Sequence, residues 1–199
     1  MLQKSGCPPR FIQLIRELHD GMTARVRFGG ELSDPFEVTR GVKQGCVLAP
    51  VLFNIYVQCI TRLLATAIGE SDTIRLNYRT DRSLFNLRKL KSESLISKSN
   101  LLELQYADDC AFVADSAESM QRILTHSAEL YRKLGLNINI QKTEFMKYNA
   151  RRTADHVNLS IEDQNLKKVP CFKYLGSYIS ANCTMDDEVN YRIGQANGA

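Results

Sequence analysis

The sequence lacks several features that would each assign it to a class of protein. It has no internal repeat, and no secretory signal is expected before the fold. Its cysteines form no C-x-x-C pair, which argues against a zinc site. Most of them lie in apolar segments and are expected to be buried free thiols of a reducing compartment, so we expect an intracellular protein, cytoplasmic or nuclear. The six cysteines are Cys7, Cys46, Cys59, Cys110, Cys171 and Cys183.

The sequence also lacks a long uninterrupted apolar run and a strong excess of either charge. Its longest apolar segment, residues 47–68, contains Asn54, Gln58, Thr61 and Arg62. A bilayer span needs roughly 20 apolar residues, so we expect no membrane partner. The net charge of +4 is compatible with an anionic partner without indicating one. A chain of 199 residues is long enough for one domain with a sizeable core.

The first part of the chain predicts two helices with a strand pair between them. After Pro9, apolar residues at helical spacing predict an amphipathic helix that ends at Gly21. Apolar residues alternate with arginines over residues 24–28, which predicts a half-buried strand, and residues 36–38 are its expected partner. A long apolar helix is expected over residues 50–68, with Gly69 ending it.

Residues 70–100 form the polar stretch of the chain, with short strand-like pieces at 74–76 and 84–87. From Arg75 to Lys98 there are seven lysines and arginines against two acidic residues. Such a run is usually a solvated face, and the alternative is a contact with nucleic acid, to which Arg25, Arg27, Arg40 and Lys43 would add.

The stretch LLELQYADDCAFVADS, residues 101–116, places Asp108 and Asp109 side by side between two apolar runs. The runs predict a β-hairpin with both carboxylates at its tip, at the solvent edge of the sheet. One interpretation is turn chemistry, because Asp is a common turn residue. The other is a metal site: adjacent carboxylates raise each other's pKa unless a cation relieves them, and Mg²⁺ takes one or two carboxylates plus substrate phosphates.

The remaining chain predicts a further helix, a strand, a hairpin and a last amphipathic segment. The helix begins at a Ser116 cap with a box-like Glu118 and ends at Gly135. Alternation over residues 136–140 predicts a strand, and a hairpin surrounds residues 172–176. The whole pattern indicates an α+β fold, with an antiparallel sheet and helices packed on one face.

Four segments in this order resemble the reverse transcriptase of non-LTR (LINE-like) retrotransposons: TRGVKQGCVLAPVLFNIYVQCI, QYADDCAFVADS, LGLNINIQKTEFM and FKYLGSYIS. The resemblance covers nearly the whole chain. It implies a partial right-hand polymerase palm over residues 1–180, and the start of a thumb or connection helix over residues 181–199. It also implies an RNA template, a DNA primer and deoxynucleoside triphosphates as partners.

The resemblance assigns roles to residues at matching positions. Asp108 would be the main and Asp109 the auxiliary ligand of Mg²⁺ or Mn²⁺, and Lys142 a candidate general acid near the leaving pyrophosphate. Taken alone, Lys142 is more simply a solvated lysine, and the two glycines before the long helix could merely break the chain. The implied nucleotide and template residues are Arg40, Gly41, Lys43, Gln44, Gly45, Tyr106 and Ala107; the implied primer residues are Tyr174, Leu175 and Gly176.

One departure from the family pattern concerns the number of carboxylates. The family supplies a further aspartate from a D-x-x-x-A-F-D-like segment, expected before Pro9. The eight residues there, MLQKSGCP, hold no carboxylate, and Asp20 and Asp34 lie in helix-end and loop contexts. We therefore expect that the first catalytic aspartate, the fingers and the thumb are absent, and that the chain is an inactive fragment with weak metal binding. The alternative is a non-catalytic, nucleic-acid-binding remnant of a retroelement.

Overall fold

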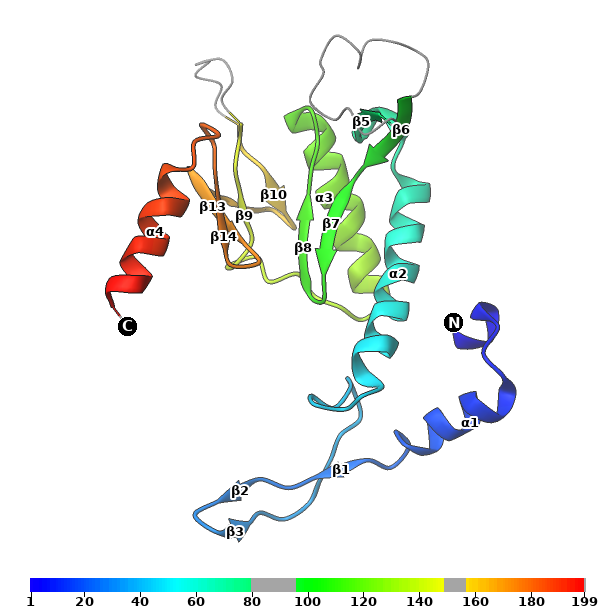
Figure 1. Ribbon diagram of the computed structural model, residues 1–199. Coiled ribbons are helices and arrows are strands. Elements are labelled where there is room, and N and C mark those ends of the chain that lie inside the picture. The colour runs from blue at the N-terminus through cyan, green and yellow to red at the C-terminus, as the bar shows by residue number, and fades with distance from the viewer. Residues whose placement is uncertain (80–95, 149–156, 199) are drawn as a thin grey trace. The chain divides into compact units, whose positions relative to one another are not determined.

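The computed structural model describes residues 1–79, 96–148 and 157–198 and shows a mixed α+β chain (Figure 1). The described residues separate into two compact units. The first unit comprises Met1–Leu63 together with Tyr106–Asp109, and the second comprises Leu64–Gln105 together with Cys110–Ala199. The residues implied as catalytic therefore fall in both units.

The first unit is built from helices and short strand pairs. Proline occupies the first turn of α1, where the missing backbone N–H costs nothing. This helix ends at Glu17, earlier than expected, and turns continue to Gly21, which has a φ of 69°. The elements of this unit are η1 (Leu2–Ser5), α1 (Pro9–Glu17), β1 (Thr23–Ala24), β2 (Arg27–Phe28), β3 (Glu31–Leu32), β4 (Phe36–Glu37) and the larger part of α2 (Ala49–Ala67).

The prediction that the strand at residues 24–28 is half-buried is wrong. Strands β1 and β4 pair, and so do β2 and β3, so the returning chain is present. However, Val26 is 57% and Phe28 87% exposed. A two-stranded ribbon has no second layer to cover its apolar side chains, so alternation along the sequence produced pairing without burial.

Helix α2 corrects the expectation that no segment of the chain is long and apolar enough to span a membrane. Its 19 residues are long and apolar enough to cross a membrane by length and composition, despite the interrupting polar residues. One such helix is weak evidence for a membrane span, because core helices of soluble proteins meet the same criterion. Ala49, Val57, Ile60 and Leu64 of α2 are buried in the structure.

The second unit holds the main helix α3 (Ala117–Lys133) and most of the strands. The predicted cap is present: the Ser119 N–H donates to the Ser116 hydroxyl (3.1 Å), and Gly135 follows the helix at φ 79°. The other elements are η2 (Glu70–Asp72), β5 (Ile74–Arg79), β6 (Ile96–Leu101), β7 (Glu103–Tyr106), β8 (Asp109–Phe112), β9 (Glu144–Phe145), β10 (Ser160–Ile161), β11 (Gln164–Asn165), β12 (Lys167–Lys168), β13 (Cys171–Tyr174), β14 (Ser177–Ser180) and α4 (Asp186–Asn197).

The expected single antiparallel sheet is replaced, over the described ranges, by two-stranded pairs. Most pairs are antiparallel hairpins, but β9 and β12 pair in parallel, with Lys167 opposite Glu144. Many of these strands are only two residues long. Strand β6 lies in the stretch classed as polar and was not foreseen; the piece at 84–87 lies outside the described residues.

The strand expected at residues 136–140 is also absent, because these residues pair with no other strand in the described part of the chain. The alternation is nevertheless real in burial: Leu136, Ile138 and Ile140 are partly buried, and Asn137 and Asn139 are exposed. Ile138 and Ile140 pack against a buried cluster. The alternation therefore predicted the burial of one side of this segment correctly, but the segment does not pair with another of the described strands.

Helix α3 supplies residues to two buried clusters. Ile123 is fully buried and belongs to one cluster, whereas Leu124 is 5% exposed and belongs to the other. Burying each such side chain contributes about 1.5–3 kcal/mol. The first cluster consists of Leu64, Ile68, Leu102 and Ile123; the second consists of Leu124, Ala128, Leu159, Ile161 and Leu166.

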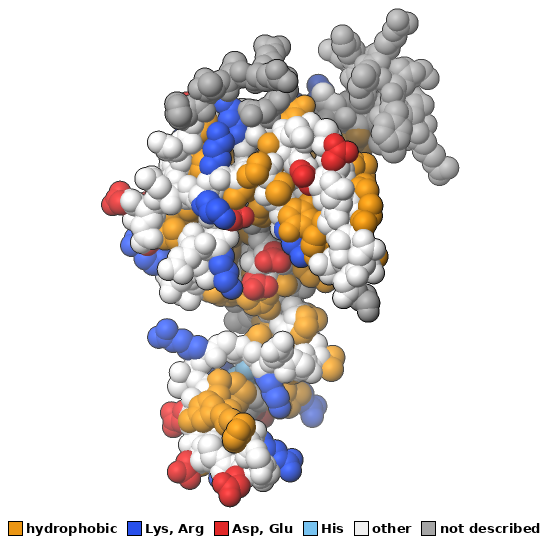
Figure 2. All heavy atoms as spheres, turned by 90° about the vertical axis from the view of Figure 1, so that its left-hand side faces the viewer, with side chains coloured by type: hydrophobic (Ala, Val, Ile, Leu, Met, Phe, Trp, Pro, Cys, Tyr) orange, Lys and Arg blue, Asp and Glu red, His pale blue; other side chains and the backbone are white. Residues whose placement is uncertain are grey.

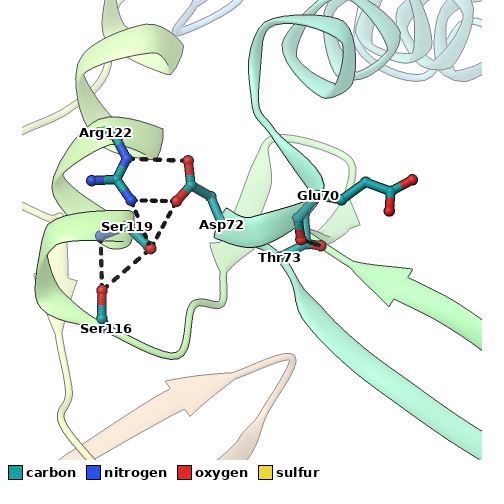
Figure 3. Close-up of polar contacts among 6 residues, drawn as sticks. All are labelled: Glu70, Asp72, Thr73, Ser116, Ser119 and Arg122. Carbon is teal, nitrogen blue, oxygen red and sulfur yellow. Dashed lines mark hydrogen bonds and ion pairs between the residues drawn. The ribbon is translucent and has the colours of Figure 1, made fainter.

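A polar cluster ties η2 to the first turns of α3 (Figure 3). Arg122 donates two hydrogen bonds to the buried Asp72, one of them from Nε at 3.1 Å, and the Ser119 hydroxyl donates to the same carboxylate (2.8 Å). The Arg122 guanidinium is the main reason that the pKa of Asp72 lies below its usual value. This cluster fixes the start of β5 against α3, and nothing in the sequence pattern indicated it.

Candidate active site

The predicted hairpin is present as β7 and β8, joined by the two-residue turn Ala107-Asp108 (Figure 1). Ala107 has a φ of 51°, and Asp108 is not in the positive-φ region. This pattern matches a type II′ turn, whose first position normally holds glycine. An alanine there stores backbone strain of about 1–3 kcal/mol, which is more common at functional sites than elsewhere.

The hairpin has one exposed and one partly buried face. Along β7, Leu104 and Tyr106 are exposed while Glu103 and Gln105 are partly buried. Asp109 is exposed and is followed by partly buried residues. Because Tyr106 and Asp109 flank a two-residue turn, they lie opposite each other and share the exposed face.

The carboxylates of Asp108 and Asp109 are both exposed, and neither forms a hydrogen bond or ion pair with the part of the chain that the structure describes. Two adjacent uncompensated carboxylates offer hard oxygen ligands of the kind that Mg²⁺ prefers. Within residues 1–79, 96–148 and 157–198, however, no three or more His, Cys, Asp or Glu residues gather closely enough to hold a metal ion. The chemistry of the donors fits a divalent cation, with water or substrate phosphates completing its shell.

The base of the hairpin is packed, and the Cys110 thiol there is held in its protonated form. The Cys110 thiol donates to Glu103 Oε2 (3.5 Å), while Glu103 Oε1 is buried with no hydrogen-bond partner among the described atoms. Burial, and next the Glu103 charge, raise the pKa of Cys110 to about 12. Burial likewise raises the pKa of Tyr131 on α3. A thiol that stays protonated is a poor nucleophile and metal ligand, so we expect Cys110 to pack the base of the hairpin rather than take part in chemistry.

The residues from Arg40 to Gly45 form a loop before α2, in the same compact unit as the tip residues Tyr106–Asp109. Gly41 and Gly45 have φ values of 84° and 83°, a conformation that favours glycine. A Cβ atom on Gly45 would meet nothing within 4 Å, so there is open space beside this backbone. The side chains of Arg40, Lys43 and Gln44 are exposed.

Lys142 lies in an exposed turn of the second unit, whereas Asp108 and Asp109 belong to the first. Its backbone N–H donates to the Asn139 side-chain oxygen (3.2 Å) and carbonyl (3.1 Å). These bonds fix the backbone of the turn and leave the ammonium group to solvent. Both interpretations of Lys142, solvated lysine and general acid, are compatible with this position.

Tyr174, Leu175 and Gly176 lie where β13 turns into β14. Leu175 (φ 49°) and Gly176 (φ 84°) form a two-residue turn of the type I′ pattern, and Leu175 is 53% exposed. The aromatic residues are partly buried: the Phe172 and Tyr174 rings are stacked with centroids 6.5 Å apart. This packing favours a structural role for the rings and leaves the turn itself as the accessible part.

Basic side chains do not merge into one continuous patch on the face that Figure 2 shows, where they alternate with acidic and hydrophobic ones. Arg25 and Arg27 are exposed on the ribbon of the first unit, but Glu31, Asp34 and Glu37 lie on the same ribbon segment. Most of the basic run at 75–98 lies outside the described residues. The structure therefore gives this stretch no geometry as a nucleic-acid contact.

Gln121 is a structural residue that the sequence did not reveal. Its side-chain amide donates to the Ser160 carbonyl (2.9 Å) and accepts from the Ser160 N–H (3.0 Å). Both free backbone groups of a short strand are thereby satisfied from α3. A glutamine on the side of an amphipathic helix gives no sequence signal for such a contact.

Comparison with known proteins bears on the whole chain. The family model described as "Reverse transcriptase (RNA-dependent DNA polymerase)" matches residues 1–179. The chain is 24% identical over 188 residues to the Retrovirus-related Pol polyprotein from type-2 retrotransposable element R2DM of Drosophila melanogaster, covering 90% of this chain and 16% of that protein. It is 20% identical over 183 residues to the RNA-directed DNA polymerase from mobile element jockey of the same organism, covering 92% and 18%. The chain spans less than a fifth of the length of these relatives.

Proposed function

This chain belongs to the reverse transcriptase (RNA-dependent DNA polymerase) family, and from that premise we propose that its β7–β8 hairpin is the catalytic hairpin of a partial polymerase palm. Its relatives named above are a Pol polyprotein of a retrotransposable element and an RNA-directed DNA polymerase of a mobile element, and the chain is a reverse transcriptase domain of the non-LTR retrotransposon type. The observation that supports the proposal is the tip itself. Asp108 and Asp109 are exposed beside a strained turn and have no cationic partner among the described residues.

In this proposal Asp108 is the main ligand of a divalent cation, Mg²⁺ or Mn²⁺, and Asp109 is the auxiliary ligand. When bound, such cations offset the charge on the attacking and leaving oxygens of nucleotidyl transfer. Tyr106, on the same exposed face, borders the nucleotide. Ala107 adopts the positive-φ conformation that the tight turn requires, and this turn places both carboxylates at the exposed tip of the hairpin.

The other proposed roles concern nucleic acid and nucleotide. Arg40 and Lys43 neutralise phosphates of the template or the incoming nucleotide, with Gln44 beside them. Gly41 and Gly45 allow the backbone to approach a base closely. Lys142 donates a proton to the leaving pyrophosphate, and the turn Tyr174–Gly176 contacts the DNA primer that is paired to an RNA template.

A second candidate function is non-catalytic binding of nucleic acid by a remnant of a retroelement. The finding in its favour is that no third ligand joins Asp108 and Asp109 among the described residues. Loss of one member of a cooperating set can remove nearly the whole catalytic gain. We therefore propose that the 199-residue chain, expressed by itself, binds nucleic acid weakly and does not extend a primer.

Binding of a fluorescent RNA–DNA primer–template, followed by anisotropy with Mg²⁺ or with chelator, tests the proposal. The wild-type chain should bind more tightly with Mg²⁺, and its binding constant should fall steeply with salt, because phosphate neutralisation releases counterions. Asp108→Asn and Asp109→Asn should remove the Mg²⁺ dependence. The control Asp163→Asn changes an exposed acid in another hairpin turn and should leave it intact.

A binding constant that changes neither with salt concentration nor with Mg²⁺ would contradict the proposal. A primer-extension assay on the same chain, with four deoxynucleotides and Mg²⁺ or Mn²⁺, tests whether the chain is inactive by itself. No extension supports the proposed inactivity, and the Mg²⁺ dependence of binding through Asp108 and Asp109 then separates the catalytic hairpin from a remnant that binds nucleic acid without it. Extension that is lost with Asp108→Asn would show that the chain is a polymerase and that another carboxylate, Asp20 or Asp34 first, completes the site.

A further inference from the structure

The last helix, α4, is fastened to the β13–β14 hairpin by a set of polar contacts, and Figure 1 shows it beside these strands. The Tyr178 backbone N–H donates to Glu188 Oε2 (2.6 Å), and the Ser180 hydroxyl donates to Asp187 Oδ2 (2.8 Å). The Lys173 ammonium donates to the Tyr191 hydroxyl (2.9 Å). Both strands of the hairpin are therefore tied to the helix.

These contacts are polar, and the Tyr178 and Tyr191 rings add one aromatic contact. No residue of α4 is buried, and Val189 and Ile193 are 47% and 54% exposed. Three acidic residues occupy its first turn, where the helix dipole favours negative charge. Arg192 donates to Glu188 Oε1 (2.8 Å), so one carboxylate serves both its own helix and the hairpin.

The hairpin turn that these contacts flank carries backbone strain. Leu175 has a φ of 49°, which costs a non-glycine residue backbone strain. Tyr178 follows this turn closely in β14 and pairs with Lys173 in β13. A hold on Tyr178 and Lys173 thus restrains the strands on both sides of the turn.

Tyr191 also orients Lys173 without neutralising it. The Lys173 ammonium lies 4.8 Å from the Tyr191 ring centroid and 5.9 Å from that of Tyr178. The Tyr178 and Tyr191 rings themselves meet edge to face, with centroids 4.7 Å apart. Aromatic faces and a hydroxyl attract an ammonium group but keep its charge available to an anion such as a phosphodiester.

We infer that α4 is a brace that holds the turn Tyr174–Gly176, and the neighbouring Lys173, in position for the phosphodiester backbone of the primer, with Glu188 and Tyr191 as positioning residues. The primer contact rests on the function proposed above. The brace lies outside the residues 1–179 that match the family model, so membership of the family does not by itself supply it.

Amide hydrogen exchange of the 199-residue chain, resolved by NMR, tests the brace. Glu188→Ala should speed exchange of the Tyr178 amide by about tenfold, because its acceptor is lost, and should leave α3 amides unchanged. Glu188→Gln keeps a side-chain oxygen for this amide and should restore most of the protection. Asp186→Ala, in the same helical turn, removes a charge but no hydrogen bond to Tyr178, so it is the matched control and should change this exchange far less than Glu188→Ala.

Primer–template binding by the same variants tests positioning as opposed to local stability. Glu188→Ala should weaken binding several-fold, Glu188→Gln should recover it, and Tyr191→Phe should weaken it with Tyr178 still protected. Unchanged exchange in Glu188→Ala would overturn the brace, and changed exchange with unchanged binding would overturn its positioning role. If the wild-type chain bound no primer–template, the proposed function would fail, whereas the exchange result would still decide whether α4 holds the turn.

Discussion

Two hairpins of this molecule carry adjacent acidic residues at their turns, and only one is a candidate site. In β7–β8 the pair is Asp108 and Asp109; in β10–β11 the turn residues are Glu162 and Asp163, with φ values of 48° and 63°. Glu162 lies 4.0 Å from the Arg132 guanidinium. The pair at the β7–β8 tip has no such cation among the described residues.

The strands beneath the two turns differ more than the turns do. Around β10–β11, Leu159, Ile161 and Leu166 are buried in a core cluster, and Gln121 satisfies the backbone of Ser160. In β7–β8, Leu104 and Tyr106 leave one face exposed. The comparison teaches that acids in a tight turn do not define a site. An exposed face beside uncompensated carboxylates distinguishes the candidate from a structural hairpin.

Truncating one apolar side chain in each hairpin should show the largest difference. Ile161→Ala removes a side chain that is 3% exposed and should lower the free energy of unfolding by about 2–5 kcal/mol. Leu104→Ala removes one that is 46% exposed and should cost less than about 1 kcal/mol. Urea denaturation of both variants measures this. Equal losses would mean that β7 is as much a core strand as β10.

Packing at the base of the β7–β8 hairpin should slow the alkylation of Cys110. With a pKa of about 12 instead of 9.0, Cys110 should react with iodoacetamide at pH 8 on the order of a thousandfold more slowly than an ordinary thiol, whereas the exposed Cys183 should react readily. Mass spectrometry of peptides from the native chain measures both rates.

The same pKa shift predicts how stability depends on pH. Because the folded pKa is raised, the protonated thiol stabilises the fold fully below pH 9, and this contribution is lost as the pH rises toward 12. Glu103→Gln removes the second cause of the shift and should speed alkylation of Cys110. Rapid alkylation of Cys110 in the wild type would contradict a packed hairpin base.

Removing the amide that holds β10 should have a smaller effect. Gln121→Ala leaves the Ser160 N–H and carbonyl without their side-chain partners, so the free energy of unfolding should fall by about 1–3 kcal/mol. Gln164→Ala, at an exposed position of the same hairpin, is the control and should change it by less than about 0.5 kcal/mol. If the two variants were equally stable, the Gln121 contact would not anchor the hairpin.

The sequence predicted most of the local elements of this fold. Proline and glycine positions gave α1 and α2 to within a few residues, and the carboxylate pair between apolar runs gave the β7–β8 hairpin. These succeeded because the turn and cap chemistry is local. Residues 136–140 show the limit: alternation predicts burial of one face, but a strand also needs a partner, which is decided by distant segments.

The candidate site was only partly accessible from the sequence. The position of Asp108 and Asp109 at the tip of a hairpin followed from the spacing of the apolar runs, although Asp109 is the first residue of β8 and not part of the turn. The resemblance of the chain to a family followed from the order of four segments. The burial of Asp72 by Arg122 and Ser119, and the hold of Glu188 on Tyr178, join residues that are far apart or on different elements. Polar contacts of this kind leave no periodicity, so the sequence could not indicate them.

Mn²⁺ titration of the chain and its tip variants, followed by the paramagnetic relaxation of water protons, tests the central claim most directly. The account predicts weak binding by the wild type, loss of about tenfold or more in affinity with Asp108→Asn and with Asp109→Asn, and no change with a Glu162→Gln, Asp163→Asn double variant. Equal losses for both hairpins, or Mn²⁺ binding that survives in Asp108→Asn and Asp109→Asn, would contradict the assignment of the β7–β8 tip as the metal site.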